Sequence, residues 1–119
     1  MKIFTSKTQK IGEKGEDAAV KYLIEKQYSI IDRNNSNRFG EIDVIAQREG
    51  NLYFFEVKAG RRGSWVNPAE NLTKTKLKKF YKAIDYYCVT HGVREYCVQG
   101  IVVVLDIKGK SDIEIIELS

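Results

Sequence analysis

The sequence predicts an α/β protein: a mixed β-sheet of about five strands flanked by helices, in the order α-β-β-β-α-β-β. Three observations predict it. Two long segments carry apolar residues at helical spacing, residues 28–58 hold three strand-length apolar segments, and residues 98–118 hold two more. With 119 residues, 43% of them hydrophobic, the chain suits one domain over residues 1–119 with its own core.

The first half of the chain predicts one helix and a series of strands. A helix is expected from about Lys10 to Gln27, because Ala19, Val20 and Leu23 share one helical face. The strands alternate with turn residues at Asn34 to Asn37 and at Glu49-Gly50. The three expected strands are Tyr28 to Arg33, about Glu41 to Arg48, and about Leu52 to Lys58.

The second half predicts a helix and two further strands. Pro68, the single proline, is a helix-start signal, and a helix is expected from about Ala69 to Thr90. Its apolar face is marked by residues at three-four spacing: Leu72, Phe80, Ala83, Ile84 and Tyr87. The apolar run Val98 to Leu105 is typical of a strand covered on both faces, and Asp112 to Leu118 alternates as a more exposed final strand.

The composition excludes several classes of function. A single histidine, His91, argues against histidine-based catalysis, and two cysteines without metal-ligand spacing argue against a zinc site or a disulfide scaffold. No segment approaches the roughly 18 apolar residues of a membrane span, so a soluble, cytoplasmic protein without membrane contact is expected. Net charge is +4, but Lys58 to Lys82 carries +7 and the rest −3. Such a concentration suits phosphate-backbone binding, although a solvated helix face explains some of it.

Ionisable residues stand at the far ends of the two strands joined at Glu49-Gly50. Counting outward from that turn places Asp43 opposite Glu56, and Glu41 opposite Lys58. Opposed like charges destabilise a hairpin unless something compensates, and a divalent cation such as Mg²⁺ takes carboxylate ligands. A turn at Gly50-Asn51 would pair Asp43 with Lys58 but keep all four groups on one face. The simpler alternative is a solvated cross-strand ion pair, which the apolar flanks IDVIA and LYFFEV disfavour.

Two motifs carry a resemblance to a known family. GEID at Gly40 to Asp43, followed by FFEVK at Phe54 to Lys58, resembles the signature of the YraN family of small bacterial proteins. That family is similar to the PD-(D/E)xK superfamily of restriction-endonuclease-like nucleases, including the archaeal Holliday junction resolvases. GEKGEDAAVKYL at Gly12 to Leu23 resembles the first helix of the family, and DRNN at Asp32 to Asn35 its Arg-Asn pair.

The resemblance implies a restriction-endonuclease-like fold and a set of site residues. Asp43 and Glu56 would bind Mg²⁺ or Mn²⁺, Lys58 would be the catalytic lysine, and Glu16 would be a helical acid approaching the same metal. Two departures concern substrate positioning. Ala59-Gly60 separates EVK from Arg61, where the family has an earlier arginine, and Gly100 stands where the family often has an aspartate.

Further residues are candidates on weaker grounds. Glu16 shares the apolar face of its helix, which fits either a site residue or a carboxylate favoured by the helix dipole. Lys76 lies on the apolar face of the second helix, so it either snorkels outward or points into a site as a phosphate contact. Trp65 either stacks on a base or closes its loop onto the core. The nucleic-acid contacts expected are Arg61, Arg62, Trp65, Lys76 and Lys79.

The leading hypothesis is a Mg²⁺- or Mn²⁺-dependent endonuclease that hydrolyses phosphodiester bonds in DNA, with roles in DNA repair and recombination. The resolvase resemblance implies branched DNA as substrate and a symmetric homodimer. The alternative is a nucleic-acid-binding module that keeps the nuclease fold without turnover. A structural protein whose hairpin charges mediate subunit contacts is the third.

Overall fold

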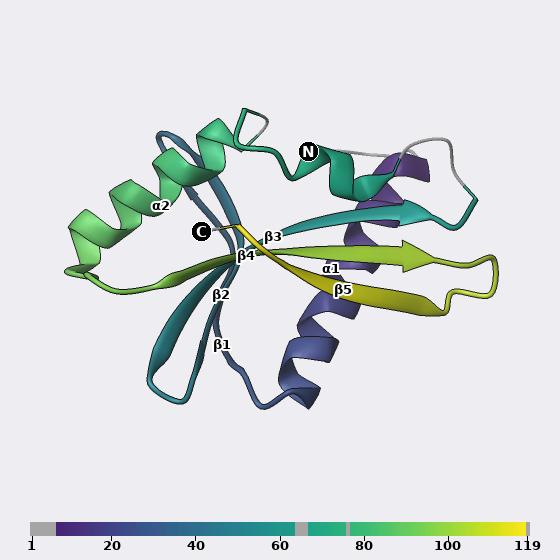
Figure 1. The fold of residues 1–119 in the computed structure, drawn as a ribbon, viewed down its shortest axis with the longest axis horizontal. Coiled ribbons are helices and arrows are strands. Elements are labelled where there is room, and N and C mark those ends of the chain that lie inside the picture. The colour runs from purple at the N-terminus through teal and green to yellow at the C-terminus, as the bar shows by residue number, and fades with distance from the viewer. Residues whose placement is uncertain (1–6, 64–66, 76, 119) are drawn as a thin grey trace.

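The computed structural model describes residues 7–63, 67–75 and 77–118. The predicted order of helices and strands is confirmed, with a short 3₁₀ helix, η1, added before the second α-helix (Figure 1). The elements are α1 (Lys7–Glu25), β1 (Ser29–Asn37), β2 (Gly40–Arg48), β3 (Asn51–Arg61), η1 (Pro68–Asn71), α2 (Lys78–His91), β4 (Cys97–Leu105) and β5 (Ser111–Glu117).

The five strands form one mixed sheet in the order β1-β2-β3-β4-β5. Neighbouring strands are antiparallel except β3 and β4, which are parallel and are connected through η1 and α2. Parallel neighbours need a crossover of this kind, because a tight turn cannot return the chain to the same end of the sheet. The predicted turn at Glu49-Gly50 is confirmed. Both residues have positive φ, at 51° and 80°, as a two-residue hairpin of this type requires.

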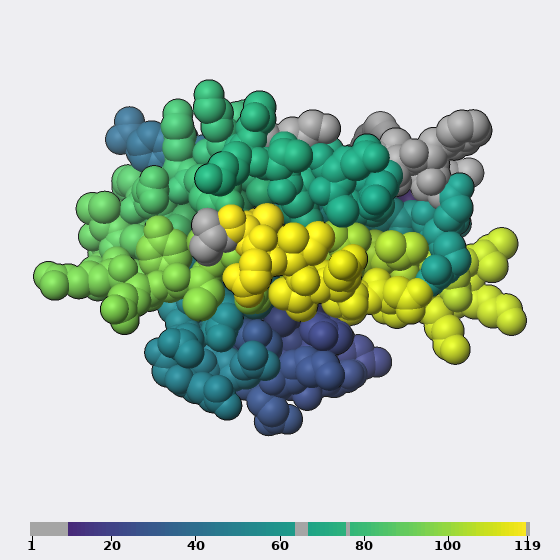
Figure 2. All heavy atoms as spheres, in the orientation of Figure 1, coloured from purple at the N-terminus to yellow at the C-terminus, as the bar shows by residue number. Residues whose placement is uncertain are grey.

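Helices cover both faces of the sheet. One core forms where α1 packs on the sheet through Ala19 and Leu23, and the other where α2 packs through Phe80 and Ile84. Both faces of β4 are buried, which explains why its side chains are apolar apart from Gln99. Figure 2 shows the face on which β5 crosses in front, with η1 and α2 above it.

Two predicted boundaries are wrong. The turn expected at Asn34 to Asn37 is part of β1, which pairs with β2 as far as Asn37 opposite Gly40. The second helix does not begin at Ala69. Pro68 starts only η1, and α2 begins at Lys78. Leu72 therefore does not lie on the apolar face of α2.

Two glycines allow close packing around β3 and β4. A Cβ added to Gly15 of α1 would lie 2.2 Å from Ala59 Cβ, so only glycine lets the helix approach β3 this closely. A Cβ at Gly100 would lie 2.7 Å from Leu72 Cδ1. Leu72 thus fills the space beside β4 that a side chain at position 100 would need.

Neither of the two α-helices is long and apolar enough to span a bilayer, within the residues described.

Candidate active site

Asp43 lies where β2 turns over between the two cores. Ile42 is buried in the core beneath α2, and Val44, two residues later, in the core beneath α1. In a regular strand these two side chains would share a face, so the strand twists sharply at Asp43. Asn34, in the facing part of β1, has a φ of 53°, a further irregularity at this point.

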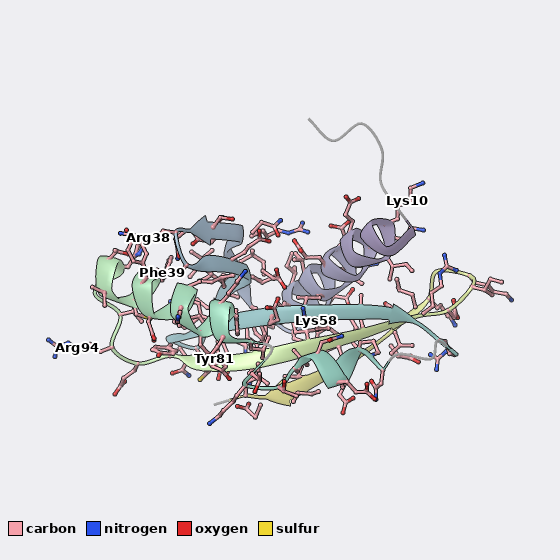
Figure 3. The ribbon with its side chains drawn as sticks, turned by 90° about the horizontal axis from the view of Figure 1, so that it is seen from above. Lys10, Arg38, Phe39, Lys58, Tyr81 and Arg94 are labelled. Carbon is pink, nitrogen blue, oxygen red and sulfur yellow. The ribbon has the colours of Figure 1, made fainter. Side chains whose placement is uncertain are left out.

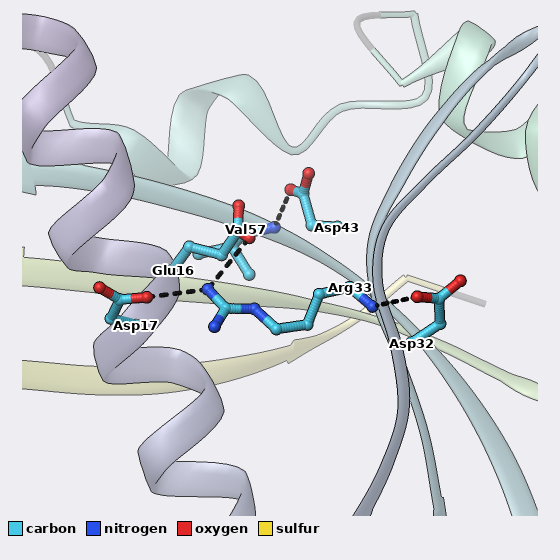
Figure 4. Close-up of polar contacts among 6 residues, drawn as sticks. All are labelled: Glu16, Asp17, Asp32, Arg33, Asp43 and Val57. Carbon is cyan, nitrogen blue, oxygen red and sulfur yellow. Dashed lines mark hydrogen bonds and ion pairs between the residues drawn. The ribbon is translucent and has the colours of Figure 1, made fainter. Parts of the chain in front are cut away.

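Counted outward from the turn, the backbone pairing of β2 with β3 ends at Val44, the residue next to Asp43. The last paired residues are Val44 and Phe55. Beyond them, Asp43 Oδ2 accepts a hydrogen bond from the backbone N–H of Val57 at 2.8 Å (Figure 4). A carboxylate has replaced a strand carbonyl as the acceptor, which leaves the two strands free to diverge.

This ending corrects the predicted register. Counting from the turn is right from Arg48 opposite Asn51 to Val44 opposite Phe55, but the expected backbone pairs of Asp43 with Glu56 and of Glu41 with Lys58 do not form. Glu41 instead pairs with Ser36 of β1, whose hydroxyl donates a hydrogen bond to its carboxylate at 3.3 Å. Lys58 pairs with Val102 of β4.

The carboxyl groups of Asp43 and Glu56 nevertheless meet. Burial, the hydrogen bond to Asp43 and the Asp43 charge together raise the pKa of Glu56 to about 9, and the Lys58 charge opposes the shift. A carboxyl group with this pKa is protonated at neutral pH and shares its proton with its neighbour. The protein alone therefore supplies too little positive charge beside the pair to keep both carboxyl groups ionised.

Two clefts meet at this carboxyl pair. The first has a volume of about 610 Å³ and includes Lys58 and Glu16 in its lining. The second has a volume of about 460 Å³ and includes Glu41 and Lys79. Asp43 and Glu56 line both clefts. The predicted cluster of four polar residues is thus divided between the clefts. Lys58 lines the first cleft, Glu41 lines the second, and the carboxyl pair lies between them.

Glu16 lies beside the site but is held by an arginine. Its carboxylate is 3.3 Å from Arg33 Nη2, and the same nitrogen is 2.8 Å from Asp17 Oδ1 (Figure 4). Burial and the Asp43 charge raise the pKa of Glu16, while hydrogen bonds from Asn34 and Arg33 lower it. Glu16 is thus close enough to Asp43 to feel its charge, while its carboxylate is bound by Arg33.

The first cleft is also lined by three residues that were not among the predicted site residues: Asp17, Arg33 and Asn34. The DRNN motif contained a signal for Arg33 and Asn34, through its resemblance to the Arg-Asn pair of the family. Nothing in the spacing indicates their contact with α1, because Arg33 and Glu16 are 17 residues apart on different elements.

The residues present fit a divalent cation held by two carboxylates. Across residues 7–63, 67–75 and 77–118, no group of three or more His, Cys, Asp or Glu side chains is arranged to hold a metal ion. However, Mg²⁺ is commonly bound by one or two carboxylates together with waters and substrate phosphates. The Asp43 and Glu56 carboxyl groups offer such a donor set, and a cation would replace the proton that they share.

The predicted nucleic-acid contacts are dispersed. Lys79 lines the second cleft. Arg61 lies at the far end of β3, where it lines a smaller cavity of about 120 Å³ with Lys10 and Lys14 of α1. Arg62 forms an ion pair with Asp112 of β5. Lys76 and Trp65 lie outside the described residues.

The part of the chain that carries this site matches a known protein family. The sequence model described as "Uncharacterised protein family UPF0102" matches residues 15–112. The chain belongs to the UPF0102 family. The match confirms the resemblance to YraN-like proteins and spans every residue of the candidate site.

Individual UPF0102 relatives match over most of their length. A UPF0102 protein of Nitratiruptor is 34% identical over 112 residues, which are 93% of each chain. One from Helicobacter hepaticus is 38% identical, covering 77% of this chain and 82% of the relative. One from Campylobacter lari is 42% identical, covering 71% and 73%.

Two solved structures are similar in fold. A repair endonuclease from Pyrococcus abyssi aligns with a TM-score of 0.44 at 14% identity, covering 92% of this chain and 42% of that chain. EndoMS in a complex with dsDNA aligns with a TM-score of 0.42 at 14% identity, covering 75% and 35%. This UPF0102 protein therefore spans less than half the length of either.

Proposed function

We propose that this UPF0102 protein is a divalent-metal-dependent endonuclease that hydrolyses phosphodiester bonds in DNA. The observation that carries the proposal is the meeting of the Asp43 and Glu56 carboxyl groups at the junction of two clefts, with Lys58 lining one of them. An open, polar site with two carboxylates and a lysine suits the cleavage of a polyanion that passes from one cleft to the other.

Each side chain has a role in this proposal. Asp43 and Glu56 would hold Mg²⁺ or Mn²⁺, which supplies a Lewis acid for the phosphate and lowers the pKa of an attacking water. The Lys58 ammonium group would donate a hydrogen bond to a phosphate oxygen and stabilise the charge that develops there. Glu16 would become a further ligand of the metal once its ion pair with Arg33 breaks. The Arg33 guanidinium would then be free to contact a phosphate.

DNA is proposed as the substrate because positive charge is concentrated near the site. The chain has a strongly basic segment from Lys58 to Lys82, with Lys58 and Lys79 lining the two clefts. Branched DNA and a homodimer remain part of the proposal through the resolvase resemblance.

A cleavage assay tests the proposal. End-labelled four-way junctions, forks and linear duplexes are incubated with Mg²⁺ or Mn²⁺ and the wild-type protein, Asp43→Asn, Glu56→Gln or Lys58→Ala. Wild-type cleavage should fall by about 10²-fold or more in each variant, the usual scale for losing a charge-stabilising group. Glu41→Gln is the matched control, since Glu41 is a nearby carboxylate without a proposed catalytic role. Equal cleavage by the wild type and all three variants would exclude this site.

A second candidate function is DNA binding without turnover. It is favoured by the ion pair between Glu16 and Arg33, which leaves two carboxylates rather than three for a metal. Salt-sensitive DNA binding that survives Asp43→Asn, with no cleavage under any metal condition, would establish it in place of the nuclease.

A further inference from the structure

An exposed aromatic pair lies at the tip of the β1–β2 hairpin. The Phe39 side chain is 41% exposed and its ring centroid lies 5.5 Å from that of Tyr86 on α2, which is 38% exposed. The guanidinium carbon of Arg38 lies 5.5 Å from the Phe39 ring centroid. Figure 3 shows Arg38 and Phe39 beside α2. We name Arg38, Phe39 and Tyr86 the tip platform.

The tip platform is fixed in position by polar contacts and close packing. Asn37 Nδ2 donates a hydrogen bond to the Ala83 carbonyl of α2 at 3.1 Å, and Asn37 Oδ1 accepts one from the Phe39 backbone N–H at 2.9 Å. A Cβ added to Gly40 would lie 2.7 Å from the Lys79 carbonyl oxygen, so the hairpin rests directly on α2. The rings are therefore held in place before any ligand binds, which lowers the entropic cost of binding.

The tip platform borders the cleft that leads to the carboxyl pair. Asn37 and Gly40, the residues on either side of Arg38 and Phe39, both line the second cleft, together with Asp43 and Glu56. Phe39 and Asp43 are four residues apart on one β-ribbon, which corresponds to about 13 Å at 3.3 Å per residue. That length is about four nucleotides of a stacked strand at 3.4 Å each, and fewer if the strand is extended.

Cations accompany the rings along the same helix. Lys79, Lys82 and Tyr86 are spaced by three and four residues, so they lie on one face of α2, and both lysines are exposed. Single-stranded nucleic acids are bound by this combination, because cations neutralise the phosphates and aromatic faces stack on the bases. Packing of the hairpin onto α2 accounts for the buried sides of the rings but not for the large exposed fraction that each retains.

We infer that the tip platform stacks on an unpaired base of a DNA strand that leads through the second cleft to the Asp43–Glu56 pair. The inference rests on the proposed function and narrows its substrate to DNA with single-stranded bases within a few nucleotides of the cleaved bond. Fully paired duplex offers no free base face to the platform.

Binding of forked DNA in EDTA tests the inference without involving cleavage. Fluorescence anisotropy is measured with a fork, with the same fork whose tail carries abasic residues, and with a blunt duplex. The wild type should bind the normal fork on the order of tenfold more tightly than the abasic fork, the scale of one base stacked on an aromatic ring. Phe39→Leu, which keeps an apolar side chain but no aromatic face, should bind both forks equally, and Phe39→Trp should restore the preference.

Tyr96→Leu is the matched control, because Tyr96 is also 38% exposed but lines neither cleft. It should keep the wild-type preference. If Phe39→Leu is not folded by circular dichroism, Tyr86→Leu takes its place in the same comparison. If the folded platform variant keeps the wild-type preference for the normal fork, the inference is overturned. The exposed rings would then serve another purpose, such as contact with a protein partner.

A cleavage assay with Mg²⁺ distinguishes failure of the proposed nuclease activity from failure of the tip-platform inference. Absence of wild-type cleavage, with base-dependent binding lost in Phe39→Leu, would overturn the proposed nuclease and support the platform. Wild-type cleavage that depends on Asp43, with no effect of Phe39→Leu on base-dependent binding, would overturn the platform alone.

Discussion

Asp43 Oδ2 takes the hydrogen bond of the Val57 N–H, at 2.8 Å, where the pairing of β2 with β3 has ended. One carboxylate therefore has a structural and a proposed chemical role. Its Oδ2 atom fixes the divergence of the strands, and the divergence opens the space in which Asp43 and Glu56 meet.

The two roles of Asp43 can be separated by substitution. Asp43→Asn keeps a carbonyl oxygen that accepts from Val57, so the free energy of unfolding should change little. Asp43→Ala leaves this part-buried N–H without its partner and should lower that free energy by about 1–3 kcal/mol. Both variants should lose cleavage. Chemical denaturation alongside the cleavage assay makes the comparison, and equal stability of Asn and Ala would show that the Val57 contact does not matter.

Glu56 should destabilise the fold at neutral and alkaline pH. A carboxyl group whose pKa rises to about 9 on folding binds its proton more tightly in the folded state. Its stabilising contribution is complete below the ordinary carboxyl pKa of about 4.3 and is lost as pH rises toward 9. Glu56→Gln avoids this loss, since the amide stays neutral. We expect the variant to be more stable than the wild type by about 1–3 kcal/mol at pH 7.5, after allowance for partial exposure.

Thermal or chemical denaturation between pH 5 and pH 8.5 measures this effect. The advantage of Glu56→Gln should be small at pH 5 and should grow with pH. Glu95→Gln, at an exposed glutamate before β4, is the control and should show no such trend. A constant difference between Glu56→Gln and the wild type over this range would contradict the predicted proton uptake.

Two glycines of α1 should respond oppositely to alanine. Gly15→Ala forces a Cβ to within 2.2 Å of Ala59 Cβ, so α1 must move away from β3. We expect a loss of about 1–3 kcal/mol, as for other overpacked positions, and a displaced Glu16. Gly12→Ala, in the same helix with nothing within 4 Å, should instead stabilise by about 0.5–1 kcal/mol. Urea denaturation of both variants is the measurement. Similar shifts at the two positions would mean that the Gly15 contact does not limit the approach of α1.

The sequence was informative wherever structure is set by local pattern. Helical spacing predicted α1, the apolar run predicted β4, and the Glu49-Gly50 turn predicted the hairpin register as far as Val44 opposite Phe55. These features depend on residues that are close along the chain. The fold order followed from them and is confirmed.

The predictions were wrong or incomplete where contacts between residues far apart in the chain determine the structure. The register count failed at Asp43 because its side chain, rather than its backbone, accepts the bond from Val57. The second helix was predicted too long because Leu72 has helical spacing, whereas it packs on Gly100 of β4. The link between Arg33 and Glu16 joins β1 to α1, and no local pattern predicts such a contact.

Titration with Mn²⁺ tests the central claim, that Asp43 and Glu56 together bind a divalent cation. Isothermal titration calorimetry is done on the wild type, Asp43→Asn, Glu56→Gln and the control Glu41→Gln. We predict one Mn²⁺ per wild-type chain, with release of about one proton at pH 7 because the shared proton must leave. Binding should be lost in Asp43→Asn and Glu56→Gln and kept in Glu41→Gln. Equal Mn²⁺ binding by all four proteins, or none by the wild type, would contradict the claim.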